Sequence, residues 1–171
     1  MSDPAPERPR VWPGAFAERL ARAAGGRFVS VVPIASSSRV RTRAEATELW
    51  RDLRTRAEEL IAEANAVLIE LPGGDGGPTL SLLDELGGDV LGFVIGYDGR
   101  WARIRREVDG PTAHVGLERS SSPGPAGHVR LAGVAAVESI VLELVLAVPS
   151  AVGTKRTFAR DDPHRRRTPA G

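Results

Sequence analysis

The chain has 171 residues, of which 42% are hydrophobic and 26% are charged, and its formal net charge is +1. It contains no cysteine, which excludes a disulfide framework, a thiolate metal site and a cysteine nucleophile. No apolar run reaches the roughly 18–20 residues of a membrane-spanning helix, and residues 1–10 lack the apolar core of a signal peptide. We therefore expect a cytoplasmic protein with no membrane partner.

The first third of the chain predicts one helix and one strand after a proline-rich start. Residues 1–13 contain four prolines, which lack the amide donor of regular structure, so they predict a flexible lead. Residues 14–24 predict a short helix that ends at Gly25-Gly26. The β-branched side chains of residues 27–34 then predict a strand. We expect a single α+β domain to span residues 14–148.

The strongest local signal lies in residues 42–66, which predict a long amphipathic helix. Thr42 and Glu45 have the spacing of a capping box, which satisfies free amides at a helix start. Apolar side chains then recur every three or four residues, with charged side chains between them. Burial of each large apolar side chain stabilises the fold by about 1.5–3 kcal/mol, so this helix should pack on a sheet. The apolar positions are Ala46, Leu49, Trp50, Leu53, Ala57, Leu60, Ile61 and Ala64.

Two segments after this helix are ambiguous between helix and strand. Val67 to Leu71 either extends the helix or forms a strand, and its β-branching favours a strand. Pro72 to Pro78 predicts a glycine-rich loop, and it lacks the Gly-Lys-Ser/Thr sequence of a phosphate-binding loop. Thr79 to Leu86 is predicted as a short helix that ends at Gly87-Gly88, with a strand as the alternative.

Residues 89–119 predict an antiparallel three-stranded meander. Asp98-Gly99 and Asp109-Gly110 both have the composition of two-residue hairpin turns. With these two loops, both hairpins present apolar side chains on the same face, and a shift of one residue would destroy that agreement. We expect this face to pack against the long helix. The predicted core pairs are Phe93–Ile104, Ile95–Ala102, Ile104–Val115 and Ala102–Leu117.

The last third of the chain predicts a buried helix and a basic tail. Val129 to Leu131 could add a brief strand. Val134 to Val148 is apolar nearly all round, which predicts a buried C-terminal helix, and its apolar excess leaves homodimerisation open. Residues 149–171 carry a charge of +4, so residues 1–148 carry +1 − 4 = −3. We expect this tail to be disordered and solvated without a specific partner, and weak binding to nucleic-acid phosphates is the alternative. Its basic residues are Lys155, Arg156, Arg160, Arg165, Arg166 and Arg167.

The predicted register also assembles one candidate ligand-binding site. Trp101, Arg103 and Arg105 share the face of the meander that points away from the core. His114 is expected opposite Arg105, and Glu118 is expected opposite Trp101. An ordinary solvated sheet face is the favoured interpretation. The two alternatives are a ligand site, in which the aromatic ring and the two arginines stack a nucleobase or hold an anion, and a helix that packs over this face.

No motif for catalysis or metal binding is present. His114, His128 and His164 do not have the spacing of metal ligands, so we expect surface histidines, no metal ion and no cofactor. The sequence therefore favours a non-enzymatic protein-interaction or regulatory module. One alternative is a protein that binds nucleic acid or an anionic ligand. The other is an enzyme that brings His114 or His128 beside a carboxylate such as Asp109 or Glu118.

Overall fold

The computed structural model describes residues 11–27, 29–71, 76–122, 124 and 127–146. These residues form the α+β fold that the sequence predicts, with three helices and a six-stranded antiparallel sheet. The predicted basic tail lies wholly outside the described residues, and the predicted lead lies mostly outside them. In chain order the elements are α1 (Ala15–Ala24), β1 (Arg41–Thr42), α2 (Arg43–Glu70), β2 (Ser81–Gly87), β3 (Val90–Tyr97), β4 (Arg100–Asp109), β5 (Thr112–Arg119), β6 (Val129–Arg130) and α3 (Ala136–Leu146).

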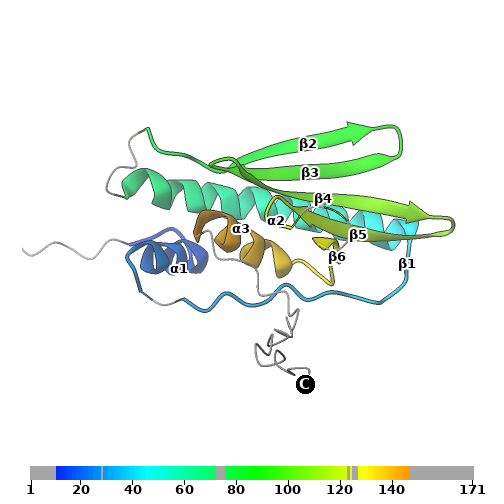
Figure 1. Ribbon diagram of the computed structural model, residues 1–171, viewed down its shortest axis with the longest axis horizontal. Coiled ribbons are helices and arrows are strands. Elements are labelled where there is room, and N and C mark those ends of the chain that lie inside the picture. Colours follow the sequence, from blue (N-terminus) through cyan, green and yellow to red (C-terminus); the bar gives the residue numbers. More distant parts are fainter. Residues whose placement is uncertain (1–10, 28, 72–75, 123, 125–126, 147–171) are drawn as a thin grey trace, which may run out of the picture.

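The molecule has two layers, with the three helices on one side of the sheet (Figure 1). The strand order is β1-β5-β4-β3-β2, and β6 also pairs with β5. The buried layer between helices and sheet contains Leu53 and Leu60 of α2, Phe93 of β3 and Ile104 of β4, all fully buried. None of the described helices is long and apolar enough to cross a membrane.

Helix α2 begins as predicted and continues further than expected. The Thr42 Oγ1 atom accepts a hydrogen bond from the Glu45 amide at 3.2 Å, and the Glu45 carboxylate accepts one from the Thr42 amide at 2.8 Å. The preference for a strand at Val67 to Leu71 is wrong, because α2 extends to Glu70. Val67 and Leu68 continue the buried face of the helix, and this burial outweighs the strand preference of β-branched residues.

The helix predicted at Thr79 to Leu86 is also wrong, since this segment forms β2. Its partner is β3, with Leu82 opposite Ile95 and Gly87 opposite Val90. Gly88 follows β2 with a φ of 55°, a backbone conformation that glycine adopts without strain. The glycines that suggested a helix end therefore belong to a hairpin turn, and the sheet gains a fourth long strand.

The strand predicted at residues 27–34 is absent from the described residues of that segment. Instead, Val31 and Ile34 pack against the core without a strand ladder. The side of β5 that faces away from β4 is occupied by β1 and β6, so β5 has no long edge left to pair with this segment. Pro33 also lacks the amide that a ladder requires. The brief strand predicted near Val129 is confirmed as β6.

The register of the meander is confirmed in the first hairpin and shifted in the second. Phe93 lies opposite Ile104 as predicted. In the second hairpin Asp109 pairs with Thr112 and Ile104 pairs with Leu117, two positions from the predicted partner. The predicted register required Pro111 to pair within the sheet, where it cannot donate a hydrogen bond. A shift of two residues keeps every side chain on its predicted face but changes its partners.

An ion pair between Arg54 and Asp84 connects α2 to β2. The Arg54 guanidinium donates to both carboxylate oxygens of Asp84, with Nε–Oδ1 at 2.6 Å and the second bond at 3.1 Å. These hydrogen bonds lower the pKa of Asp84, because they stabilise its charged form. The pair therefore stabilises the fold above the ordinary pKa of an aspartate, about 3.9. That contribution is lost as the pH falls through the lower folded-state pKa.

The Asp84→Asn variant should lose about 0.2–1 kcal/mol of unfolding free energy at neutral pH, the usual range for an exposed pair. The difference from the wild type should shrink in acid, as the native carboxylate becomes protonated. Urea denaturation at a series of pH values measures this, with Asp52→Asn, which changes an exposed aspartate of α2, as the control. A constant difference between Asp84→Asn and the wild type down to strongly acidic pH would contradict the assignment.

Candidate functional site

The polar candidate residues lie on the outer face of the sheet, which we define as the face pointing away from α2. Alternation along each strand places the apolar side chains of the core on one face and these residues on the other. They are half-buried by their neighbours, and no described helix packs on this face. The outer-face residues used below are Leu83, Glu85, Val94, Trp101, Arg103, Arg105, Glu107, His114 and Glu118.

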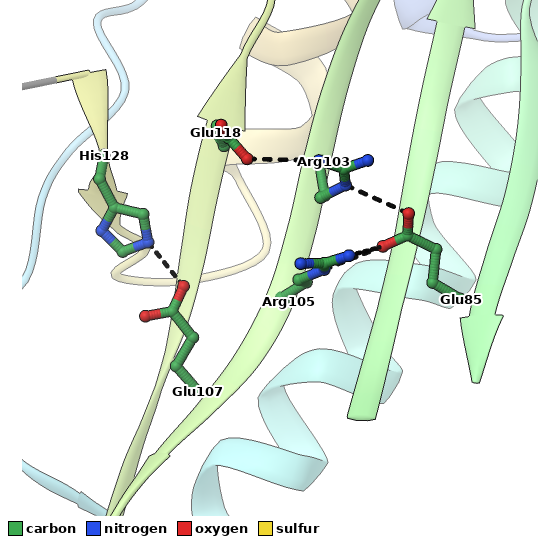
Figure 2. Close-up of polar contacts among 6 residues, drawn as sticks. All are labelled: Glu85, Arg103, Arg105, Glu107, Glu118 and His128. Carbon is green, nitrogen blue, oxygen red and sulfur yellow. Dashed lines mark hydrogen bonds and ion pairs between the residues drawn. The ribbon is translucent and has the colours of Figure 1, made fainter. Parts of the chain in front are cut away.

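Two arginines and two glutamates form a continuous network on the outer face (Figure 2). Glu85 accepts from Arg103 Nε at 3.2 Å with one oxygen and from Arg105 Nε at 2.9 Å with the other. Arg103 also donates to Glu118 at 3.4 Å. The positive charge of both arginines is therefore balanced locally by carboxylates. Glu85 was not foreseen in this network because its segment was expected to be a helix.

Trp101 and Arg103 are neighbours on the outer face, as the register predicts. The Arg103 guanidinium lies 5.1 Å from the centre of the Trp101 ring system, within the range of a cation–π contact. Trp101 is opposite Gly96, in the register of the first hairpin. The expectation for Glu118 is wrong, since the shifted second hairpin places it opposite Arg103. The structure thus groups Trp101, Arg103 and Arg105 on one face, with both arginines held in ion pairs.

A second cluster joins Glu107 of β4 to His114 of β5 and to His128, which precedes β6. The prediction that His114 faces Arg105 is wrong, because the register places it opposite Glu107. The Nε2 atom of His114 lies 2.9 Å from Glu107 Oε2, and the Nε2 atom of His128 lies 2.8 Å from Glu107 Oε1. One carboxylate thus contacts both imidazoles, and Figure 2 shows the His128 contact.

Space for the side chains of Glu107, His128 and Arg105 depends on two glycines, one in each of the strands that flank β4. A Cβ atom at Gly116 of β5 would lie 2.6 Å from His128 Cε1 and 2.8 Å from Glu107 Oε1. A Cβ atom at Gly92 of β3 would lie 2.9 Å from Arg105 Cγ. These distances are too short for real contacts. The absence of a side chain at Gly116 and Gly92 therefore lets the side chains of His128, Glu107 and Arg105 lie directly over the strand backbone.

Sequence reasoning found His114 but missed Glu107 and His128 as its neighbours. Proline at position 111 was the usable signal, because placing it in the loop puts His114 opposite Glu107. Nothing local could place His128, which reaches the sheet through the segment between β5 and β6. Neither Asp109 nor Glu118, the carboxylates considered for an enzyme, belongs to this cluster.

The basic residues predicted to contact nucleic acid, Lys155 to Arg167, lie outside the described residues. Nucleic-acid binding by this basic tail therefore stays a prediction. Comparison with protein-family models, with curated proteins and with solved structures found no match to this chain.

Proposed function

We propose that the protein is a non-enzymatic interaction module that binds a second copy of itself through the free edge of β2. The observation that carries this proposal is the edge itself. Strand β2 is seven residues long and pairs with β3 on one side only, among the described residues. It presents Leu83 and Leu86, which are 66% and 62% exposed. A long edge with unpaired backbone groups is a template for another strand.

The charges on β2 do not protect this edge from pairing. Soluble proteins commonly block an edge strand with unpaired charges or proline. The two charged side chains of β2 are Asp84 and Glu85, and both already have arginine partners within the chain. Arg54 holds Asp84 on the helix side of the sheet, and Arg105 holds Glu85 on the outer face. Their charges are balanced, so they oppose a second strand only weakly.

A twofold arrangement centred on Leu83 fits this edge. Antiparallel pairing about a residue keeps the helices of both copies on the same side of a continuous sheet. Centring on Asp84 or Glu85 would place like charges directly opposite each other, which destabilises a strand pair. With Leu83 at the centre, Ser81 faces Glu85 of the other copy and Leu82 faces Asp84. The Val94 side chain beside Leu83 adds a second apolar group on the outer face.

Helix α3 supports the homodimer less than its sequence suggested. Its apolar side chains are largely buried within the chain, including Val137, Ile140 and Val141. The apolar excess noted in the sequence therefore packs on the chain's own core. Anion binding through the Trp101 and Arg103 surface also has less support than the dimer, because an anion would have to displace the carboxylates that hold the two arginines.

The test is the mass of the protein in solution, measured by sedimentation velocity across the micromolar range. The wild type should form a concentration-dependent dimer of the 18.2 kDa chain. Leu83→Lys should shift it to monomer, because two like charges would meet at the twofold axis. The matched control is Val40→Lys, which changes a 68% exposed side chain outside the sheet. A wild-type monomer at every concentration, or equal dimerisation of both variants, would contradict the proposal.

A further inference from the structure

We propose that Glu107, His114 and His128 bind a first-row divalent transition-metal ion, for which zinc is the best-matched probe. Each side chain offers one ligand atom, and the three ligand atoms lie within 4.8 Å of one another. The cluster lies on β4, β5 and the residue before β6, and β3 separates these strands from the β2 edge. This inference is therefore independent of the proposed dimer.

The donor set has the chemistry of a known class of metal site. Two imidazole nitrogens and one carboxylate oxygen bind zinc with a fourth position left open for water or substrate. The same set with open positions also suits ferrous iron. A site for calcium or magnesium would instead need mostly oxygen ligands. The two histidines thus point to a borderline transition metal rather than to a hard cation.

The distances need little change to admit an ion. The two Nε2 atoms lie 2.9 Å and 2.8 Å from the two Glu107 oxygens. In a tetrahedral zinc site with bonds of about 2.0–2.2 Å, neighbouring ligand atoms lie about 3.2–3.6 Å apart. Small rotations of the side chains would open the cluster by that amount. The ion would take the place of the Nε2 hydrogens that face Glu107, and each neutral imidazole would then carry its one hydrogen on Nδ1.

The imidazole rings are already arranged to converge. The His114 and His128 ring centres lie 5.9 Å apart, with an angle of 86° between the ring planes. Both rings are only half-buried, so an ion can reach them from solvent. Gly116 maintains the convergence, because any side chain there would push His128 away from Glu107. A preformed site requires ligands that their surroundings hold in place, and Gly116 supplies the space for that here.

The first experiment titrates the full chain with zinc chloride by calorimetry, at a mildly alkaline pH where free imidazole is neutral. The wild type should bind one ion. His114→Gln and His128→Gln should each weaken binding by at least about 10-fold, the lower limit for removing even an outer partner of a ligand. His164→Gln, which changes the third histidine of the chain, should leave the affinity unchanged. Circular dichroism confirms that each variant is folded.

The second experiment disturbs the geometry without removing a ligand. Gly116→Ala should weaken zinc binding because the new methyl group displaces His128. Gly92→Ala is the matched control, since it makes the same substitution on the same face but crowds Arg105. It should leave zinc binding unchanged. X-ray absorption of the zinc-loaded wild type gives an independent measure and should show two imidazoles in the coordination shell.

Three results would overturn the proposal. The first is a wild-type chain that does not bind zinc, in which case the cluster is only a hydrogen-bonded group. The second is binding that survives the His114 and His128 variants but is lost in His164→Gln. The third is a coordination shell without two imidazoles. The oligomeric state of the same variants is measured in parallel, so that a failure of this site is distinguished from a failure of the dimer.

Discussion

The Glu143→Ala variant is expected to lose about 3–5 kcal/mol of unfolding free energy, the cost of breaking a buried ion pair by removing one partner. Glu143 of α3 lies 3.1 Å from Arg119 of β5, and their side chains are 13% and 6% exposed. Without this carboxylate, the guanidinium stays buried and loses the anion that balances its charge. Urea denaturation followed by circular dichroism measures the loss.

Two further variants separate the charge effect from packing. Glu58→Ala removes a glutamate that is 71% exposed and pairs with Arg54, so it should change the stability by less than about 1 kcal/mol. The double variant Arg119→Met with Glu143→Leu replaces the pair by apolar groups and should recover most of the loss. A Glu143→Ala variant no less stable than Glu58→Ala would show that the buried charge is well solvated.

The Phe93→Ala variant is expected to lose about 3–5 kcal/mol, the usual cost of a large cavity in a core. Phe93 is fully buried at the centre of β3, between the sheet and α2. Its ring centre lies 6.1 Å from that of Trp50, in the tilted arrangement that aromatic pairs favour. The substitution removes both the apolar burial and this aromatic contact.

Val90→Ala supplies the comparison for Phe93→Ala on the same strand. Val90 is 46% exposed, so its truncation should change the stability by less than about 0.5 kcal/mol. Thermal denaturation of both variants provides a second measure beside urea. Equal losses would mean that Phe93 lies in a region able to collapse around the cavity, against the packing described above.

The two hairpins of the meander show which parts of the fold are local. The turn at Asp98 and Gly99 has positive φ at both residues, 48° and 75°, and was predicted correctly from the two side chains alone. The next turn was misplaced because Asp109-Gly110 has the same composition. Pro111 excludes that register, and the loop moves to Gly110 and Pro111 with Gly110 at a φ of 58°.

The misplaced turn left the core intact but changed the outer face. Because side chains alternate with a period of two, Val115 and Leu117 stay on the buried face in either register. On the other face the same shift replaces Arg105 by Glu107 as the neighbour of His114. The neighbour of His114 is therefore a carboxylate and not a guanidinium. The metal proposal depends on this difference, because a carboxylate can be a metal ligand and a guanidinium cannot.

The wrong element predictions have a common cause in tertiary packing. Residues 67–71 have a strand-like composition but continue a buried helix face. Residues 79–86 are followed by two glycines that suggested a helix end but belong to the hairpin between β2 and β3. Residues 27–34 have the β-branching of a strand but find no free edge beside β5. In each segment the local preference of the residues for helix or strand stabilises the fold less than apolar burial or strand pairing does, and these depend on the whole fold.

The sequence by itself determined the start and apolar face of α2, the first hairpin of the meander and the inward or outward direction of its side chains. These features depend on hydrogen bonds and periodicity within a few residues. Only the tertiary structure decided which charged groups meet, since Glu85 reaches Arg105 through a strand pairing and His128 reaches Glu107 through a loop that returns to the sheet. Such contacts depend on the register between strands and on segments far apart in the sequence coming together. No local sequence pattern encodes either of these.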